Sequence, residues 1–178
     1  MKVVSFSDQF PDIKITEGVF FKDERGSLKK VMFGEALKDL IDPVSEVIVS
    51  NSKKNVIRGL HFQDPPHEVT KLVTCVSGKI LDCFLDIRKK SPTYGLYSSV
   101  YLEEDDKKAI LIPKGFAHGY SVISDEAIVV YLQSGHFSEK HDQAINPLSL
   151  NIDWKVNDYN LSYKDKNAVP FDEFETLF

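Results

Sequence analysis

Short apolar runs separated by polar turns fill the middle of the chain, from Val56 to Gln133. Apolar runs of this length, bounded by Gly, Pro, Ser and Asp, are typical of β-strands. No helical period separates them, so the pattern predicts an all-β sandwich or barrel instead of a parallel α/β sheet. The predicted strands are Leu72–Val76, Ile80–Ile87, Ser98–Leu102, Ala109–Ile112, Tyr120–Val122 and Ala127–Leu132.

The two flanks carry weaker patterns, and the whole chain, residues 1–178, is expected to form a single domain. Residues 1–18 read as short strands and turns, a strand starts at Val19, and Asp23–Gly26 reads as a turn. The apolar face of Phe33–Ile41 predicts a helix. Val44–Val49 is predicted as a strand that ends in a polar turn, Asn51–Lys54. The tail from Asn151 is mixed, and its last residues, Phe171–Phe178, are expected to form a short helix.

The stretch Val56–Gly78 combines strand-like runs with three basic side chains, Arg58, His61 and Lys71. Strict alternation predicts that Ile57, Gly59 and His61 share one face of a strand, with Arg58, Leu60 and Phe62 on the other. A guanidinium, an imidazole and an ammonium around one strand pair indicate an anionic ligand and proton transfer. The stretch alone leaves a second interpretation open, in which Arg58 and Lys71 are surface charges and His61 is a core residue.

Composition excludes several classes of function. The net charge is −5 and no basic cluster exceeds two lysines, which argues against a nucleic-acid partner. No apolar run approaches the ~20 residues of a membrane span, and the N-terminal residues lack a signal-peptide core, so a cytoplasmic protein is expected. Cys75 and Cys83 lie in apolar runs and are expected to be buried free thiols, too few for a zinc site.

The segment Ile112–Tyr120, I-P-K-G-F-A-H-G-Y, contains P-x-G-x-x-H, which is typical of a turn between two strands of a cupin jelly roll. In metal cupins this histidine, here His118, joins an earlier H-x-H pair and a carboxylate. Here the earlier segment reads His61-Phe62-Gln63, so the pair is absent. The sequence favours a cupin-type double-stranded β-helix without a metal, with a metal site as the weaker alternative. His67, beside Pro66, is expected in a surface loop.

Several motifs then match one family in order and spacing: R-G-L-H-F-Q (58–63), K-L-V (71–73), D-I-R-K-K-S-P-T-Y-G (86–95), the segment around His118, and Tyr131. From about Val19 to Pro170, the chain resembles the dTDP-4-dehydrorhamnose 3,5-epimerase family. The resemblance implies a cupin jelly roll, usually a homodimer, that acts on nucleoside-diphosphate 4-keto-6-deoxy sugars. It also implies that no metal or redox cofactor is needed.

The resemblance also implies a role for each site residue. The ketone at C4 acidifies the C–H bonds at C3 and C5, so one group removes a proton and another returns one on the opposite ring face. His61 matches the base, Asp165 its partner, Tyr131 the acid, and Lys71 the group that holds the enolate oxygen. The expected substrate contacts are Arg58, Gln63, His118, Phe137 and Arg25, the last donated across the dimer. The alternatives are a core Tyr131 and a surface Lys71 or Asp165.

Departures from the family pattern bear on the substrate. After Asp23–Gly26 the chain continues Ser27-Leu28-Lys29-Lys30 in place of aromatic residues and a glutamate, and Glu46 and Ile48 replace Gln and Asn. A different base such as guanine is therefore plausible, as in relatives that act on GDP-linked 4-keto heptoses for bacterial capsules. Phe137 replaces a second tyrosine, which puts inversion at C5 in doubt.

Three rival functions remain. A C3-only epimerase and a 3,4-ketoisomerase share this fold, although the ketoisomerases generally carry H-x-H where this chain has H-F-Q. A non-enzymatic sugar-binding cupin needs no acid–base pair, so the joint presence of His61, Lys71 and Tyr131 counts against it.

Overall fold

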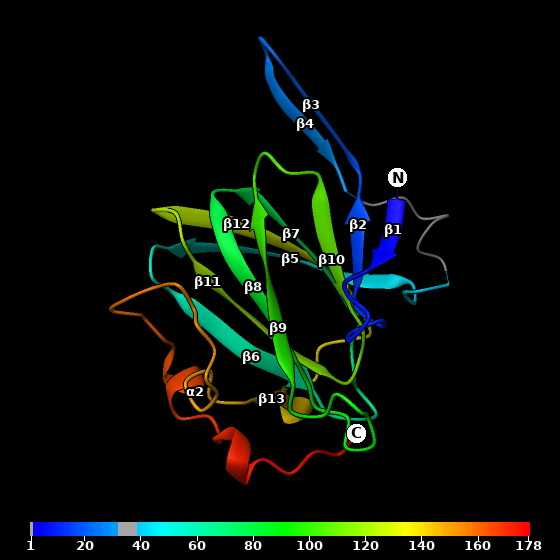
Figure 1. Cartoon of the computed structure of the whole chain (residues 1–178), viewed down its shortest axis with the longest axis vertical. Helices are drawn as coiled ribbons and strands as arrows, with labels where there is room; N and C mark the ends of the chain where they lie inside the picture. Colours follow the sequence, from blue (N-terminus) through cyan, green and yellow to red (C-terminus); the bar gives the residue numbers. More distant parts are fainter. Residues whose placement is uncertain (1, 32–38) are drawn as a thin grey trace.

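The computed structural model describes residues 2–31 and 39–178. Two antiparallel sheets pack face to face and form a cupin-type jelly roll (Figure 1). The six-stranded sheet has the order β1-β2-β10-β7-β12-β5. Its strands are β1 (Lys2–Ser5), β2 (Lys14–Glu17), β10 (Lys108–Ile112), β7 (Lys71–Ser77), β12 (Glu126–Ser134) and β5 (Val44–Lys53).

The second sheet has five strands in the order β13-β6-β11-β8-β9. They are β13 (Asp142–Ala144), β6 (Ile57–Gln63), β11 (Phe116–Val122), β8 (Lys79–Asp86) and β9 (Tyr97–Glu103). Strands near in sequence, such as β7 and β8, lie in different sheets, whereas each sheet collects strands from distant parts of the chain. This crossing between layers brings β6 opposite β12 and β5, which frames the interior of the sandwich.

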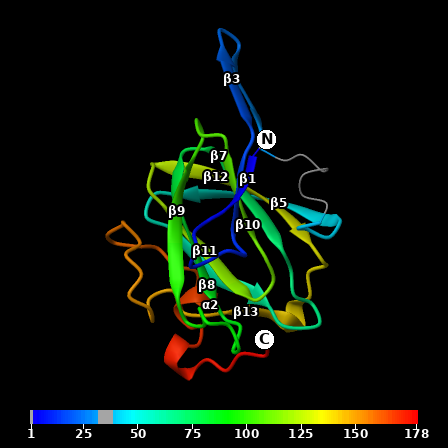
Figure 2. The ribbon, with the colours of Figure 1, turned by 45° about the vertical axis from the view of Figure 1, so that its right-hand side comes forward.

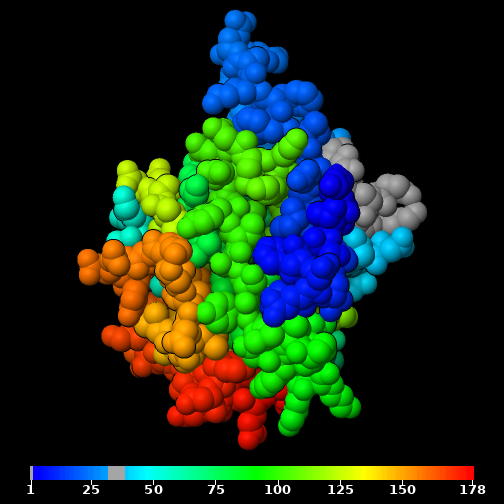
Figure 3. Space-filling view, in the orientation of Figure 1, coloured from blue at the N-terminus to red at the C-terminus, as the bar shows by residue number. Residues whose placement is uncertain are grey.

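The hairpin of β3 (Val19–Asp23) and β4 (Gly26–Lys30) forms a separate two-stranded sheet. It projects from the body of the sandwich in both ribbon views, and the space-filling view shows it standing clear of the surface (Figures 1–3). Phe21 and Leu28 on this hairpin are 62% and 60% exposed. An exposed apolar hairpin of this kind is typical of a surface that meets another chain.

Alternation along the strands builds the main core between the two sheets. Buried side chains from both layers interdigitate there, including Val73, Phe84, Ile110, Tyr120 and Val129. Phe84 makes edge contacts with Phe6 and Phe10, each at 5.1 Å between ring centroids, which bind the N-terminal segment to the sandwich. Both cysteines are buried free thiols, as predicted.

The C-terminal tail packs against the outer face of the five-stranded sheet through an apolar cluster. The tail contains the one-turn helix α2 (Tyr163–Lys166) and the 3₁₀ turn Phe171–Glu173, whereas a further 3₁₀ turn, Glu139–His141, precedes β13. Trp154 packs against the sheet, and its indole N–H donates to the carbonyl of Pro147. Backbone hydrogen bonds join Asn160 to Asn55 and Ile57, at 2.9 and 3.0 Å, so the tail lies directly beside β6.

The D-I-R-K-K-S-P-T-Y-G motif stabilises a turn and does not line the cavity described below. The carboxylate of Asp86 accepts hydrogen bonds from Arg88, Ser91 and Thr93, and Arg88 also pairs with Asp12 at 2.8 Å. Although burial would raise the pKa of Asp86, these hydrogen bonds hold it below its usual range. The motif that contributed to the family resemblance therefore serves the fold.

Most predicted strands are confirmed, with differences at their ends. β5 runs on through Lys53, so the predicted turn at Asn51–Lys54 is wrong. β11 starts at Phe116, which places His118 inside a strand and not in a turn. The tail forms only a 3₁₀ turn within the predicted helix Phe171–Phe178. The predicted helix Phe33–Ile41 lies mostly outside the described residues.

The predicted faces of β6 are also wrong. Ile57, Leu60 and Phe62 pack in one outer cluster, whereas Arg58 and His61 both line the interior cavity. The cause is an irregularity in the strand: the pairing of β6 with β11 shifts register between His118 and Tyr120. A strand with such a shift does not keep a period of two.

Candidate active site

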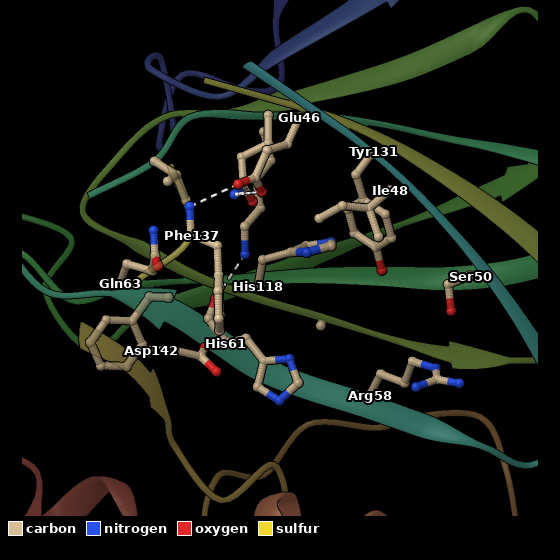
Figure 4. Close-up of a pocket in the computed structure, with 15 residues that line it drawn as sticks. Glu46, Ile48, Ser50, Arg58, His61, Gln63, His118, Tyr131, Phe137 and Asp142 are labelled. Atoms are coloured by element: carbon tan, nitrogen blue, oxygen red, sulfur yellow. Dashed lines mark hydrogen bonds between the residues drawn. The ribbon is translucent and has the colours of Figure 1, made fainter. Parts of the chain in front are cut away.

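A cavity of about 330 Å³ opens between the two sheets. Its walls come from β5 and β12 on one side and from β6 and β11 on the other, with β7 beside β12 (Figure 4). Seven of the predicted site residues line it: Arg58, His61, Gln63, Lys71, His118, Tyr131 and Phe137. Asp165 does not line the cavity but hydrogen-bonds to His61. Arg25 is the remaining predicted site residue, and it lies away from the cavity.

His61 and Asp165 form a hydrogen-bonded pair at the edge of the cavity. The imidazole Nε2 lies 2.5 Å from Asp165 Oδ1, and the side chain of Asp165 is only 2% exposed. Burial would raise the pKa of Asp165, but its hydrogen bonds to His61, Ser162 and the Gly59 N–H lower it below its usual range. A carboxylate fixed on Nε2 holds that nitrogen as the N–H donor and leaves Nδ1 as the basic atom.

The tail places Asp165 there. Ser162 caps the one-turn helix α2, and its side chain accepts a 3.0 Å hydrogen bond from the N–H of Asp165. A serine at this position is a favoured helix cap because its oxygen satisfies a backbone donor left open in the first turn. The cap and the contacts of Asn160 with β6 together bring the carboxylate under His61, although more than a hundred residues separate the two.

Lys71 contributes a cation from β7. Its ammonium donates to the carbonyl of His61 at 3.2 Å and faces the cavity. Burial lowers the pKa of Lys71 to about 8, against the opposing effects of Asp142 and Asp82. The amine therefore stays charged at neutral pH and is placed to meet an anion in the cavity.

His118 is held by a buried carboxylate. Its Nε2 lies 2.8 Å from Asp82 Oδ2, and the two side chains are 3% and 0% exposed. Its ring also contacts Tyr131 edge to face, with ring centroids 5.7 Å apart. The pair with Asp82 orients the imidazole toward the cavity, in the same way that a carboxylate orients a catalytic histidine.

Tyr131 lies on β12, across the cavity from His61 on β6 (Figure 4). Burial raises the pKa of Tyr131, and the neighbouring Tyr120 and Asp82 raise it further, while Arg58 opposes them. The phenol is therefore protonated at neutral pH and can act as a proton donor.

Arg58 is the exposed cation of the cavity. Its Nε donates to Ser52 Oγ at 2.8 Å, and Nη2 reaches the carbonyl of Asn51 at 3.5 Å. The serine comes from the end of β5 that was predicted to be a turn. Arg58 thereby lies at one end of the cavity, with donors left to meet an anionic group such as a phosphate.

The opposite end of the cavity is a loop that carries Phe137. The Gln63 amide donates to the carbonyls of His67 and His136, at 2.8 and 3.2 Å, and accepts from the N–H of Ser138 at 2.7 Å. These contacts hold the loop in place, so Gln63 acts here on the backbone of its own chain. Phe137 itself is 59% exposed beside the cavity.

Other cavity residues occupy positions for which the sequence analysis predicted no role or a different one. Glu46 accepts a 2.8 Å hydrogen bond from the N–H of Phe137 and a 3.2 Å bond from Gln133 Nε2. Ser50 and Asp142 also line the cavity. The alternation Glu46, Ile48, Ser50 along β5 is a signal for an inward face, but the predicted strand, Val44–Val49, ends one residue before Ser50.

Arg25 lies at the tip of the projecting hairpin and is not part of the cavity of its own chain. It pairs with Asp23 at 2.6 Å, and its side chain is 85% exposed. Among the described residues, no group of three or more His, Cys, Asp or Glu side chains is placed to hold a metal ion. Metal independence itself stays a prediction. Within the same residues, no helix is long and apolar enough to cross a membrane.

Comparison with known proteins agrees with this arrangement. The family model described as dTDP-4-dehydrorhamnose 3,5-epimerase matches residues 7–173. The chain belongs to the dTDP-4-dehydrorhamnose 3,5-epimerase family. It is 41% identical over 169 residues to the dTDP-4-dehydrorhamnose 3,5-epimerase of Shigella flexneri, covering 92% of this chain and 93% of that one. Membership makes this protein a sugar-nucleotide epimerase, and therefore an isomerase.

Two solved structures in the same group show the range of the family. The dTDP-6-deoxy-D-glucose-3,5-epimerase of Legionella pneumophila, in complex with dTDP-4-keto-L-rhamnose, superposes with a TM-score of 0.90 at 32% identity and covers 98% of this chain and 94% of its own. A 3'-monoepimerase from Streptomyces bikiniensis, in complex with dTDP-quinovose, gives 0.82 at 30% identity, with 89% and 83% covered. Both double and single epimerases thus share this fold.

Proposed function

We propose that this epimerase inverts C3, and more slowly C5, of a dTDP-linked 4-keto-6-deoxy sugar. One observation carries the proposal: His61 and Tyr131 line the same cavity from facing sheets (Figure 4). Inversion of a carbon next to a ketone needs a base on one face of the ring and an acid on the other. A cavity between two sheets supplies two such faces, with the sugar ring between them.

In the proposed reaction, each side chain acts in the position and protonation state described above. Nδ1 of His61 removes the proton from carbon, and Asp165 stabilises the imidazolium that forms. The electron pair moves to the C4 oxygen, where the Lys71 ammonium stabilises the enolate. Tyr131 then returns a proton to the opposite face of the ring. Lys71 is charged for this purpose at neutral pH, since its pKa is about 8.

The diphosphate is assigned to the Arg58 end of the cavity. Arg58 presents a guanidinium at the surface, and His118 lies on the neighbouring strand, held by Asp82. Cations and N–H donors of this kind are the usual partners of phosphate oxygens. Phe137 at the other end offers an exposed aromatic face for a ring of the ligand.

The nucleotide is proposed to be dTDP on the strength of the relatives, whose printed names refer to dTDP sugars. The guanine alternative rests on Ser27–Lys30, Glu46 and Ile48. Ser27–Lys30 lies in the projecting hairpin, and the Glu46 carboxylate already accepts bonds from Gln133 and the Phe137 N–H. Calorimetric titration with dTDP and GDP decides between them: tighter binding of dTDP is expected, and tighter binding of GDP would favour the heptose branch and a role in capsule synthesis.

We further propose that the active species is a homodimer in which Arg25 reaches the cavity of the partner. The projecting hairpin with its exposed Phe21 and Leu28 supports this arrangement. Neither residue has a place in the core of its own chain, so burial against a second copy would remove apolar surface from water.

The reaction is tested by incubating the protein with a dTDP-linked 4-keto-6-deoxyhexose and following inversion by NMR, before and after exhaustive chelation. Inversion that survives chelation is expected, because no H-x-H pair is present. Loss of turnover that a divalent ion restores would instead support a metal cupin. Transfer of the ketone from C4 to C3 would identify a 3,4-ketoisomerase, and binding without turnover a sugar-binding cupin. A C3-only epimerase is the closest alternative, since a monoepimerase shares the fold.

A further inference from the structure

A group of hydroxyls lies beside Tyr131 and has no part in the mechanism above. Tyr120 on β11 is fully buried, and its ring centroid lies 6.5 Å from that of Tyr131. Its hydroxyl lies 2.9 Å from Ser50 Oγ and 3.1 Å from Ser52 Oγ. Both serines come from β5, and Ser50 lines the cavity on the side of Arg58 (Figure 4). The hydroxyls therefore connect the surroundings of Tyr131 with the exposed end of the cavity.

The hydroxyl of Tyr120 is not needed for packing. The residue belongs to the main core, where its neighbours include Val73, Phe84 and Val129. A phenylalanine ring would fill the same space without bringing a polar atom out of water, which costs free energy unless the atom is hydrogen-bonded. The two serines supply those bonds. A buried hydroxyl with dedicated partners next to a proton donor calls for a functional explanation.

The donors and acceptors in this group have a definite direction. Arg58 can only donate, so Ser52 Oγ accepts from Arg58 Nε at 2.8 Å and keeps its own hydrogen for Tyr120, at 3.1 Å, or for Ser50, at 3.4 Å. Tyr120 then has its hydrogen free for Ser50 or for Tyr131. The ring of Tyr120 lies against that of Tyr131, and Tyr120 is among the neighbours that raise the pKa of Tyr131. A hydroxyl that can accept from Tyr131 and later donate to it is suited to proton transfer in both directions.

We propose that Tyr120 and Ser50 form a proton relay that restores the proton of Tyr131 while the sugar nucleotide is still bound. The proposal rests on the role of Tyr131 as the acid. When Tyr131 protonates carbon, its O–H bond breaks and a phenolate remains. The Tyr120 O–H bond then breaks as the Tyr131 O–H bond re-forms. Ser50 passes its proton to Tyr120 and takes one from water at the cavity mouth, and His61 releases its proton to solvent.

The relay solves a problem that a double epimerase faces. A bound sugar fills the space between His61 and Tyr131, so water cannot reach the phenol from the front. Inversion of a second centre in the same binding event needs a protonated Tyr131. A relay through β11 and β5 approaches the phenol from the side that the sugar leaves open.

The alternative is that Tyr120 acts only through Ser52, by holding Arg58. The two roles are separated by three variants. Tyr120→Phe removes one oxygen and keeps the ring, and Ser50→Ala interrupts the relay without touching Arg58. Ser52→Ala removes the hydrogen-bond partner of Arg58 and one of the two partners of Tyr120 but leaves the route Ser50, Tyr120, Tyr131 intact, so it is the matched control.

The measurement is the number of deuterium atoms in product formed early in D₂O with substrate in excess, read by mass spectrometry beside kcat and KM. For wild-type enzyme, doubly labelled product is expected even though C5 is the slower centre, because the relay restores Tyr131 while the sugar nucleotide is still bound. Tyr120→Phe and Ser50→Ala are expected to release mainly singly labelled product, with at least fivefold lower kcat and KM within twofold. Ser52→Ala is expected to raise KM and keep the wild-type labelling ratio.

Each other outcome overturns the relay. Wild-type labelling in both Tyr120→Phe and Ser50→Ala would show that Tyr131 regains its proton elsewhere, and a rise in KM alone would assign Tyr120 to holding Arg58. Singly labelled product from the wild type would mean that no relay is needed. Tyr131→Phe is tested first: if it inverts at the wild-type rate, the proposed acid is wrong and the relay fails with it. If Tyr120→Phe does not fold, the labelling ratio of Ser50→Ala alone tests the relay.

Discussion

At the scale of single residues, the cavity controls the charge of Lys71. Burial lowers its pKa to about 8, so the fraction of ammonium falls about tenfold for each pH unit above that value. If the ammonium stabilises the enolate, kcat/KM of the wild type falls above pH 8. Lys71→Arg keeps its charge at these pH values, so its profile should stay flat to pH 10 although its absolute rate is lower. An identical alkaline decline in both proteins would assign that limb to another group.

Phe137 is expected to affect the relative rates of inversion at C3 and C5. A tyrosine hydroxyl at this position could hold the ring conformation needed for C5 inversion through one hydrogen bond, worth about 0.5–1.5 kcal/mol net or up to roughly tenfold in rate. Exchange at C3 should therefore be faster than exchange at C5, and Phe137→Tyr should raise the C5 rate more than the C3 rate. The two rates are read from NMR of the substrate in D₂O. Equal rates that the substitution leaves unchanged would remove position 137 from the choice.

At the scale of elements, Gly59 permits the irregularity in β6. Because of that irregularity, the side chains of Arg58 and His61 both face the cavity. The φ of Gly59 is +117°, and a Cβ there would lie 2.6 Å from both the Gly119 Cα and the His118 carbonyl oxygen. Gly59→Ala should lower the free energy of unfolding by at least about 2 kcal/mol, from backbone strain and overpacking together. Gly26→Ala is the control, because its φ is +120° with nothing within 4 Å of a Cβ. Equal urea midpoints for the two variants would contradict this explanation.

The same strand shows what sequence patterns can predict about this fold. Apolar runs predict most strands of the sandwich, because burial of alternate residues on a sheet leaves a local trace. They do not predict the face of Arg58, since the register shift depends on the close approach of Gly59 to β11. They also miss the end of β5, where Ser50 and Ser52 look like turn residues but hydrogen-bond to Tyr120 inside the sandwich.

The contact of α2 with β6 depends even less on local sequence. Nothing in Leu161–Asp165 alone indicates a buried carboxylate, and only the family resemblance pointed to Asp165. The structure confirms that it lies against His61, because Ser162 caps the helix and Asn160 bonds to β6. Contacts between segments so far apart in sequence are fixed by tertiary packing and leave no periodic signal.

At the scale of the whole molecule, the projecting hairpin predicts a shared active site. Arg25→Ala should raise KM at least tenfold and leave the dimer intact by light scattering, whereas Lys22→Ala on the same hairpin should change KM little. Mixing Arg25→Ala subunits with His61→Asn subunits should recover activity. A mixed dimer then holds one cavity with an intact His61 and an Arg25 from its partner. Exchange of subunits without any recovery would contradict a site shared across the dimer.

The main functional conclusion depends on the sandwich, which places His61 and Tyr131 on facing sheets. Neither sheet alone contains both residues. The sequence identified these two residues through the family motifs, and the fold supplies their opposition across one cavity. The most direct test follows deuterium entry and inversion at C3 and C5 of a dTDP-linked 4-keto-6-deoxyhexose by NMR in D₂O. It compares the wild type with His61→Asn and Tyr131→Phe. The wild type should exchange and invert, His61→Asn should do neither, and Tyr131→Phe should exchange label with little inversion. Exchange by His61→Asn at the wild-type rate would contradict the assignment of His61 as the base.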